Sequence, residues 1–126
     1  MSELKFSEDH EWLRIEDDGT ATIGITDYAQ EQLGDLVFVQ LPEVGRELAQ
    51  GEEAAAIESV KSASDIKLAV AGTVIEVNEA LADEPGKINE DPMGDGWFFK
   101  IRIADPAPLA GLMDENAYAE HVAGLG

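Results

Sequence analysis

Short strand-type segments separated by turn residues recur along most of this chain, and they restrict it to an all-β fold class. Residues 11–16 alternate apolar and polar side chains, which is typical of a half-buried strand. Residues 20–25 are rich in β-branched side chains, and residues 36–41 form an apolar run, read as a buried strand, that stops at Pro42. Many short strands at near-regular spacing favour a sandwich or a barrel. Further strands are predicted over residues 52–60, 65–70, 73–77 and 97–103.

Helical signals are confined to short segments. A helix over residues 27–33 is expected to begin at a cap formed by Thr26 or Asp27 and to end at Gly34. A C-terminal helix over residues 115–122 is expected to cover a sheet edge or an open end. The remaining signals are a helical turn at 78–82, a loop at 85–92, an N-cap at Asp105 followed by Pro106, and an N-cap at Asp114.

The chain contains no segment long or polar enough to act as a linker, so we expect one domain over residues 1–126. It has no cysteine, which excludes disulfides and thiolate metal sites. His10 and His121 are far apart in sequence and lack a third ligand at suitable spacing, so we expect no metal site. Phosphate-binding glycine motifs and the Gly-x-Ser-x-Gly elbow of hydrolases are also missing from the sequence.

Acidic residues outnumber basic ones by 27 to 8, which gives a net charge of −19. Such a surface repels nucleic acids and anionic membranes, and it favours fast association with basic surfaces of partner proteins. The alternative is that the charge serves solubility alone. No apolar run approaches the roughly 20 residues that a spanning helix needs. The first residues show no targeting signal, so we predict a cytoplasmic location. We also expect a monomer.

Lys61 lies midway between the strands predicted over residues 52–60 and 65–70. It is one of only five lysines, and small neighbouring side chains would let a modifying enzyme reach its amine. A lysine in a loop is more often a solvated surface charge, and residues 60–63 hold no Gly, Pro, Asn or Asp to mark a turn. The residues around Lys61 alone therefore leave both interpretations open.

The segment Glu58-Ser59-Val60-Lys61-Ser62-Ala63-Ser64-Asp65-Ile66 resembles the lipoylation motif of glycine cleavage H proteins. Asp9-His10-Glu11-Trp12 resembles the N-terminal signature of the same family. One departure follows Ile66, where the chain has Lys67 and lacks the proline that the family usually shows. We expect Lys67 to lie in a strand. Further blocks of resemblance follow in order over residues 24–30, 33–35, 37–39, 41–45, 72–81, 88–92 and 96–97.

The resemblance implies a lipoyl/biotinyl-like fold, a barrel-sandwich hybrid of two antiparallel sheets with small helical additions and a C-terminal helix. It implies that Lys61 stands at the tip of a β-hairpin and carries (R)-lipoate, attached by a lipoate ligase or lipoyl transferase. Glu58, Ser59 and Val60 belong to the modification motif. The group would be bound as an amide, which removes the charge of the lysine.

The implied function is that of a carrier without catalysis of its own. The carrier takes the aminomethyl group of glycine from glycine decarboxylase (P protein) to an aminomethyltransferase (T protein). It then passes electrons to dihydrolipoyl dehydrogenase (L protein). In the family a cleft protects the loaded arm, and the resemblance places its acidic residues at Glu11 and Asp65 in this chain. We add Asp9 because of its position beside the N-terminal signature. The simpler alternatives are an exposed strand carboxylate for Glu11 and a turn-closing residue for Asp65.

Other functions stay open at this point. Biotinyl domains usually place methionines on both sides of the lysine, whereas Val60 and Ser62 flank it here. Lipoyl domains of 2-oxo acid dehydrogenases usually carry Asp before the lysine and lie in longer chains. An H-like protein can instead act as a lipoyl relay or donor for other lipoyl-dependent complexes. An unmodified interaction protein with the same fold is the alternative from another class.

Overall fold

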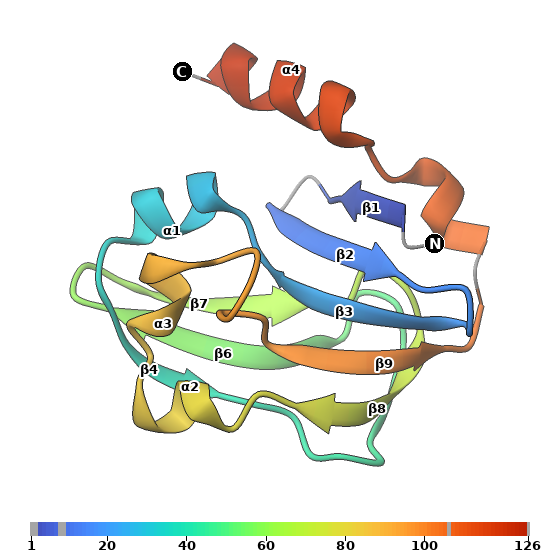
Figure 1. The fold of residues 1–126 in the computed structure, drawn as a ribbon, viewed down its shortest axis with the longest axis horizontal. Coiled ribbons are helices and arrows are strands. Elements are labelled where there is room, and N and C mark those ends of the chain that lie inside the picture. The colour runs from blue at the N-terminus through green and yellow to red at the C-terminus, as the bar shows by residue number, and fades with distance from the viewer. Residues whose placement is uncertain (1–2, 8–9, 106, 126) are drawn as a thin grey trace.

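Two antiparallel β-sheets form most of the protein in this computed structural model, which describes residues 3–7, 10–105 and 107–125 (Figure 1). The larger sheet has the strand order β1-β2-β3-β9-β8-β5, and the smaller has the order β4-β6-β7. The strands are β1 (Glu3–Phe6), β2 (Glu11–Ile15), β3 (Thr20–Ile25), β4 (Leu36–Gln40), β5 (Glu47–Leu48), β6 (Glu53–Ser59), β7 (Ala63–Lys67), β8 (Gly72–Val77) and β9 (Phe99–Ile103).

The helices are short. Within the described ranges, none is long and apolar enough to cross a membrane. They are α1 (Asp27–Leu33), α2 (Ala80–Asp83), α3 (Lys87–Glu90), the 3₁₀ helix η1 (Ala107–Gly111) and α4 (Glu115–Leu125). Helices α1, α2 and α3 lie together at one end of the sheets (Figure 1). The expected class, an all-β barrel-sandwich hybrid with small helical additions and a C-terminal helix, is confirmed.

The predicted strands match observed ones within two residues at each end, with one exception, and two observed strands were not predicted. The strand predicted over 65–70 is wrong in its bounds, because pairing with β6 begins at Ala63 and ends at Lys67. Strands β1 and β5 were not predicted, since four and two residues are too few to show a pattern.

The helix over 27–33 is confirmed together with both of its ends. The Thr26 hydroxyl accepts a hydrogen bond from the Ala29 N–H at 3.3 Å, and Gly34 ends the helix with a φ of 79°. The loop predicted over 85–92 is wrong, because it contains α3, which the fully buried side chain of Ile88 anchors in the core.

Both N-caps predicted near the C-terminus carry hydrogen bonds. Asp114 accepts one from the Ala117 N–H at the start of α4. Asp105 accepts one from the Ala107 N–H at the start of η1, and Pro106 lies outside the described residues.

The facing sides of the two sheets enclose one large apolar core, and a smaller cluster forms around Trp12. The Trp12 ring is fully buried and its indole N–H donates to the Pro92 carbonyl at 2.9 Å. Gly24 lies opposite the ring, where a Cβ would come within 2.7 Å of it, so only glycine allows this close approach. Trp97 is half-buried and packs against the same cluster.

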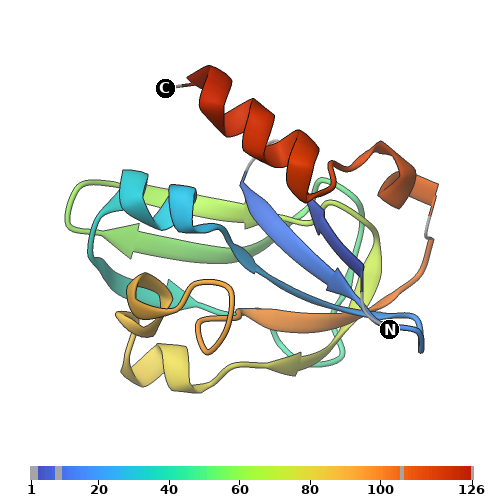
Figure 2. The ribbon, with the colours of Figure 1, turned by 45° about the horizontal axis from the view of Figure 1, so that its top comes forward.

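Helix α4 covers the edge of the larger sheet, as expected (Figures 1 and 2). The Tyr118 ring stacks on the Phe6 ring of edge strand β1, with 4.5 Å between ring centroids. Before the helix, Met113 exchanges two backbone hydrogen bonds with Phe6, at 2.8 and 2.9 Å. These contacts cover and extend an otherwise open strand edge.

Candidate functional site

Strands β6 and β7 form a hairpin whose tip projects at one end of the molecule. The last backbone pair of the hairpin joins Glu58 to Ala63. Residues 60–62 lie beyond both strands and form the tip. In both views the tip lies on the same side of the molecule as α1 (Figure 2).

The side chain of Ser59 fixes the backbone of this turn. Its hydroxyl oxygen accepts hydrogen bonds from the N–H groups of Lys61 (3.2 Å) and Ser62 (3.1 Å). The Ser59 N–H also donates to the Ser62 carbonyl at 2.7 Å. A serine hydroxyl can bond turn N–H groups in this way, so the turn forms without Gly, Pro, Asn or Asp.

Lys61 is exposed at the tip, and so are its neighbours Val60 and Ser62. Within the residues that the structure describes, no ion pair engages the Lys61 amine. The lysine stem lies against Gly34 at the end of α1, where an added Cβ would be 3.3 Å from the Lys61 Cε. The amine is therefore open to solvent while its stem has a neighbour to rest on.

Exposed apolar side chains accompany the tip. Val37, Phe38 and Val60 expose 55%, 49% and 65% of their surface. The prediction of a fully buried strand over 36–41 is wrong here, because a register shift between Leu36 and Phe38 turns both Val37 and Phe38 outward. Phe38 pairs with Glu58, which is also exposed. Apolar side chains beside a projecting lysine suit contact with another protein.

Glu11 lies at the start of β2 and is only 3% exposed, so the alternative of an exposed strand carboxylate is wrong. It lines a cavity of about 330 Å³, to which Ser7, Lys67 and Met113 also contribute. The Ser7 hydroxyl accepts a hydrogen bond from the Glu11 N–H at 3.3 Å. An acidic residue that lines a cavity is suited to attract a cationic group there.

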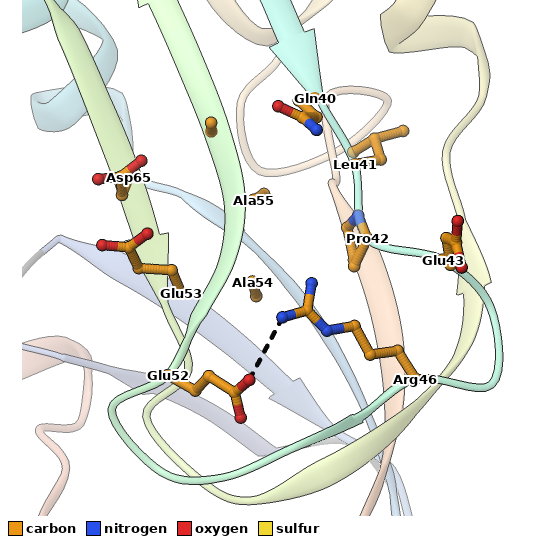
Figure 3. Close-up of a pocket in the computed structure, with 11 residues that line it drawn as sticks. Gln40, Leu41, Pro42, Glu43, Arg46, Glu52, Glu53, Ala54, Ala55 and Asp65 are labelled. Atoms are coloured by element: carbon orange, nitrogen blue, oxygen red, sulfur yellow. Dashed lines mark hydrogen bonds and ion pairs between the residues drawn. The ribbon is translucent and has the colours of Figure 1, made fainter.

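Asp65 lies within β7, so the alternative of a turn-closing residue is also wrong. Its exposed side chain points away from the core because the next residue, Ile66, points into it. Asp65 lines a larger, open groove of about 820 Å³ (Figure 3). There Arg46 bonds Glu52 at 3.3 Å. The Ala49 N–H, and then the Arg46 guanidinium, hold the pKa of Glu52 below its usual value.

The structure does not bring the two predicted cleft carboxylates into one cavity. Glu11 lines the smaller cavity and Asp65 the larger groove. Lys67, which lies in β7 as expected, connects them: it shares a face of the strand with Asp65 and lines the cavity of Glu11. Asp9 lies outside the described residues.

A cluster of rings beneath α4 was not expected from the sequence. The Tyr118 hydroxyl is 2.8 Å from His10 Nδ1 and 2.6 Å from the Thr26 hydroxyl. The His10 ring lies 4.7 Å from Tyr28 and 5.9 Å from His121. Across the described part of the chain, no three His, Cys, Asp or Glu side chains gather as a metal site. Tyr118 is 108 residues from His10 and 92 from Thr26 in the sequence, and these separations concealed the cluster.

A two-sheet fold that presents an exposed lysine at a hairpin tip defines the lipoyl/biotinyl class of carrier domains. A model of the glycine cleavage H-protein family matches residues 4–124. The chain belongs to this family, and it is a lipoyl-carrier component of the glycine cleavage system.

Individual relatives agree along nearly the whole chain. The glycine cleavage system H protein of Rhodospirillum rubrum is 57% identical over 125 residues, which cover 99% of each chain. That of Marinobacter nauticus is 61% identical over 122 residues, which cover 97% of this chain and 94% of the relative. The crystal structure of a glycine cleavage system H protein from Mycobacterium marinum superposes with a TM-score of 0.88 at 38% identity. The superposed region covers 96% of this chain and 97% of the chain from Mycobacterium marinum.

Proposed function

We propose that the chain carries (R)-lipoate as an amide on Lys61 and shuttles between glycine decarboxylase, aminomethyltransferase and dihydrolipoyl dehydrogenase without catalytic groups of its own. The observation that carries the proposal is the exposed Lys61 amine on a turn that Ser59 fixes. When bound, the lipoyl group supplies a dithiolane that carries an aminomethyl group and electrons through thiol–disulfide chemistry.

The surroundings of Lys61 suit both acylation and delivery. The tip projects beyond the paired strands, so a lipoate ligase or lipoyl transferase is able to enclose the amine without opening the sheet. Val60, Phe38 and Glu58 offer apolar surface and one carboxylate beside it. In this proposal the lipoate-attaching enzyme recognises the modification motif, Glu58, Ser59 and Val60, through these apolar and acidic side chains.

In this proposal Glu11, in the smaller cavity, and Asp65, in the larger groove, each supply a carboxylate for the loaded arm. The aminomethyl cargo bears an amine that is cationic near neutral pH, and a carboxylate in a cavity attracts it while limiting its exposure to water. Burial of Glu11 and the position of Asp65 on β7 support these roles. Asp9 is proposed on the family resemblance alone.

Several further properties belong to the proposed carrier role. The single domain over residues 1–126, the monomeric state and the cytoplasmic location remain predictions. So do the three named partner enzymes and the ligase. A role as lipoyl donor to other complexes has no structural feature of the described residues in its favour over the shuttle.

Reconstitution tests the proposal. The chain is incubated with lipoate, ATP and a lipoate ligase, and then added to glycine decarboxylase in an assay of carbon exchange between glycine and bicarbonate. We expect wild type to gain one lipoyl group and support exchange, and Lys61→Ala to do neither. Lys100→Ala is the control, because Lys100 is a lysine of β9 that lies outside the hairpin and lines neither the cavity nor the groove, and it should behave as wild type. Lipoylation of Lys61→Ala, or no exchange by the lipoylated wild type, would contradict the proposal.

A further inference from the structure

The side chain of Asn89, in helix α3, binds the chain segment that runs from α1 to β4. Its Oδ1 accepts a hydrogen bond from the Leu36 N–H at 2.9 Å. Its Nδ2 donates to the Gly34 carbonyl and to Gln30 Oε1, both at 2.9 Å. Because the Leu36 N–H only donates and the Gly34 carbonyl only accepts, a single orientation of the amide satisfies both backbone partners.

Residues 34–36, which we call the connector, lie directly beside the hairpin tip. Asn89 binds the connector on both sides of its middle residue, Asp35. The Asp35 carbonyl accepts a hydrogen bond from the Val60 N–H at 3.0 Å. Gly34 contacts the stem of Lys61, since an added Cβ would lie 3.3 Å from the Lys61 Cε. The connector therefore touches the tip at the lysine and at the residue before it.

Asn89 thus acts on Lys61 through one intervening segment. Without its amide, Gly34 and Leu36 lose the partner that joins them, and the connector is free to move relative to α3. The Asp35 carbonyl then no longer holds the Val60 N–H at a fixed place. Movement of the tip reduces the fraction of molecules that present the Lys61 amine in one orientation, and apparent affinity falls with that fraction.

We propose that Asn89 is a positioning residue for acylation of Lys61: its amide fixes the connector, and the connector fixes the hairpin tip for the lipoate-attaching enzyme. This inference rests on the proposed function, because it needs Lys61 to be the acceptor. It assigns to a residue of α3, which lies 28 positions after the lysine in sequence, a part in recognition without direct contact.

The chain offers a matched control in Asn78. Asn78 is also half-buried, and its Nδ2 donates to two backbone carbonyls, those of Asp95 and Trp97, both at 2.8 Å. Neither of these carbonyls belongs to the connector or to the hairpin. Asn78→Ala therefore removes a comparable set of side-chain-to-backbone hydrogen bonds away from Lys61.

The experiment compares wild type, Asn89→Ala, Asn89→Asp and Asn78→Ala. Asn89→Asp keeps an acceptor for the Leu36 N–H but loses both donors, so it serves if the alanine variant does not fold. Two measurements are made well below the unfolding temperature. One is the hydrogen exchange of the Val60 amide by NMR, and the other is the kinetics of lipoylation by a lipoate ligase with the apo chain as varied substrate.

For both Asn89 variants we expect KM to rise about tenfold with kcat within about twofold, as a fall of the competent population to about one tenth requires. The tip is then open in most molecules, so the Val60 amide should lose most of its protection from exchange. Asn78→Ala should change neither quantity. If the Asn89 variants match Asn78→Ala in Val60 exchange and in KM, the positioning role is overturned. A wild-type chain that accepts no lipoyl group at all would overturn the proposed function, and this inference with it.

Discussion

Ser59 shows how one hydroxyl decides the shape of the functional turn. The Ser59 hydroxyl accepts hydrogen bonds from the Lys61 and Ser62 N–H groups, and the Ser59 N–H donates to the Ser62 carbonyl. Ser59 therefore binds three backbone groups of the tip. The turn contains no residue that favours tight turns by its own backbone preference, so its geometry comes from these hydrogen bonds. Lys61 is thus displayed by the serine two positions before it.

Ser59→Ala should leave the core intact but loosen the tip. We expect a change in the free energy of unfolding of less than about 1 kcal/mol, because the lost bonds are exposed. Lipoylation kcat/KM should fall about three- to tenfold, the effect of about one net hydrogen bond. Ser62→Ala is the control, since Ser62 bonds Ser59 through its backbone N–H and carbonyl, which the substitution keeps. Equal kinetics for the two variants would contradict the role of Ser59.

At the scale of elements, Tyr118 joins α4 to the rest of the fold, and Val122 of the same helix packs against the same cluster. Tyr118 stacks on Phe6 and shares its hydroxyl with His10 and Thr26, so it joins α4 to β1, to the segment before β2 and to the cap of α1. Burial raises the pKa of Tyr118 above its usual value, and the Thr26 hydroxyl opposes this shift to a smaller extent. The fold therefore favours the neutral phenol.

The pKa shift predicts a loss of stability at high pH. A raised pKa in the folded state gives a contribution that is complete below the unfolded value of about 10 and is lost as pH rises through the folded value. Thermal unfolding between about pH 8 and 11.5 should show a steeper decline of Tm for wild type than for Tyr118→Phe. Lysine titration affects both chains alike, so parallel curves would contradict the shift.

Elements with a strong local pattern were predictable, and those that depend on contacts were not. Residues 20–25 and 27–33 carry β-branched or capping signals within their own sequence, and both elements were predicted correctly. Helix α3 has one turn and exists because Ile88 is buried, which no local pattern reports. The outward turn of Val37 and Phe38 depends on a register shift with β6 and was equally hidden.

The site divides in the same way. Lys61 was proposed as the acceptor through the family motif, and in the structure it lies between β6 and β7 at the hairpin tip. The burial of Glu11 and its separation from Asp65 depend on contacts between segments that are far apart in the sequence, so the sequence did not reveal them. Asn89 stood within a matching block, but its three hydrogen bonds need the helix α3 that was not predicted.

For the whole molecule, the net charge of −19 predicts electrostatic steering toward partners with basic surfaces. The rate of association with glycine decarboxylase should fall about tenfold or more between roughly 0.01 and 0.5 M salt, since the screening length shortens severalfold over this range. Stopped-flow measurement of binding by the lipoylated chain tests this. An association rate that does not change with salt would show that the charge has no part in the encounter.

The proposed carrier role requires that the Lys61 amine is lipoylated, and peptide mapping by mass spectrometry measures this modification directly. The chain is purified from its native cells, its intact mass is measured, and its fragments are sequenced. We predict a single lipoyl addition on the fragment that contains Lys61, and none on those that contain Lys5, Lys87 or Lys100. A lipoyl group on Lys67, or a chain that is wholly unmodified in cells with an active glycine cleavage system, would contradict the account.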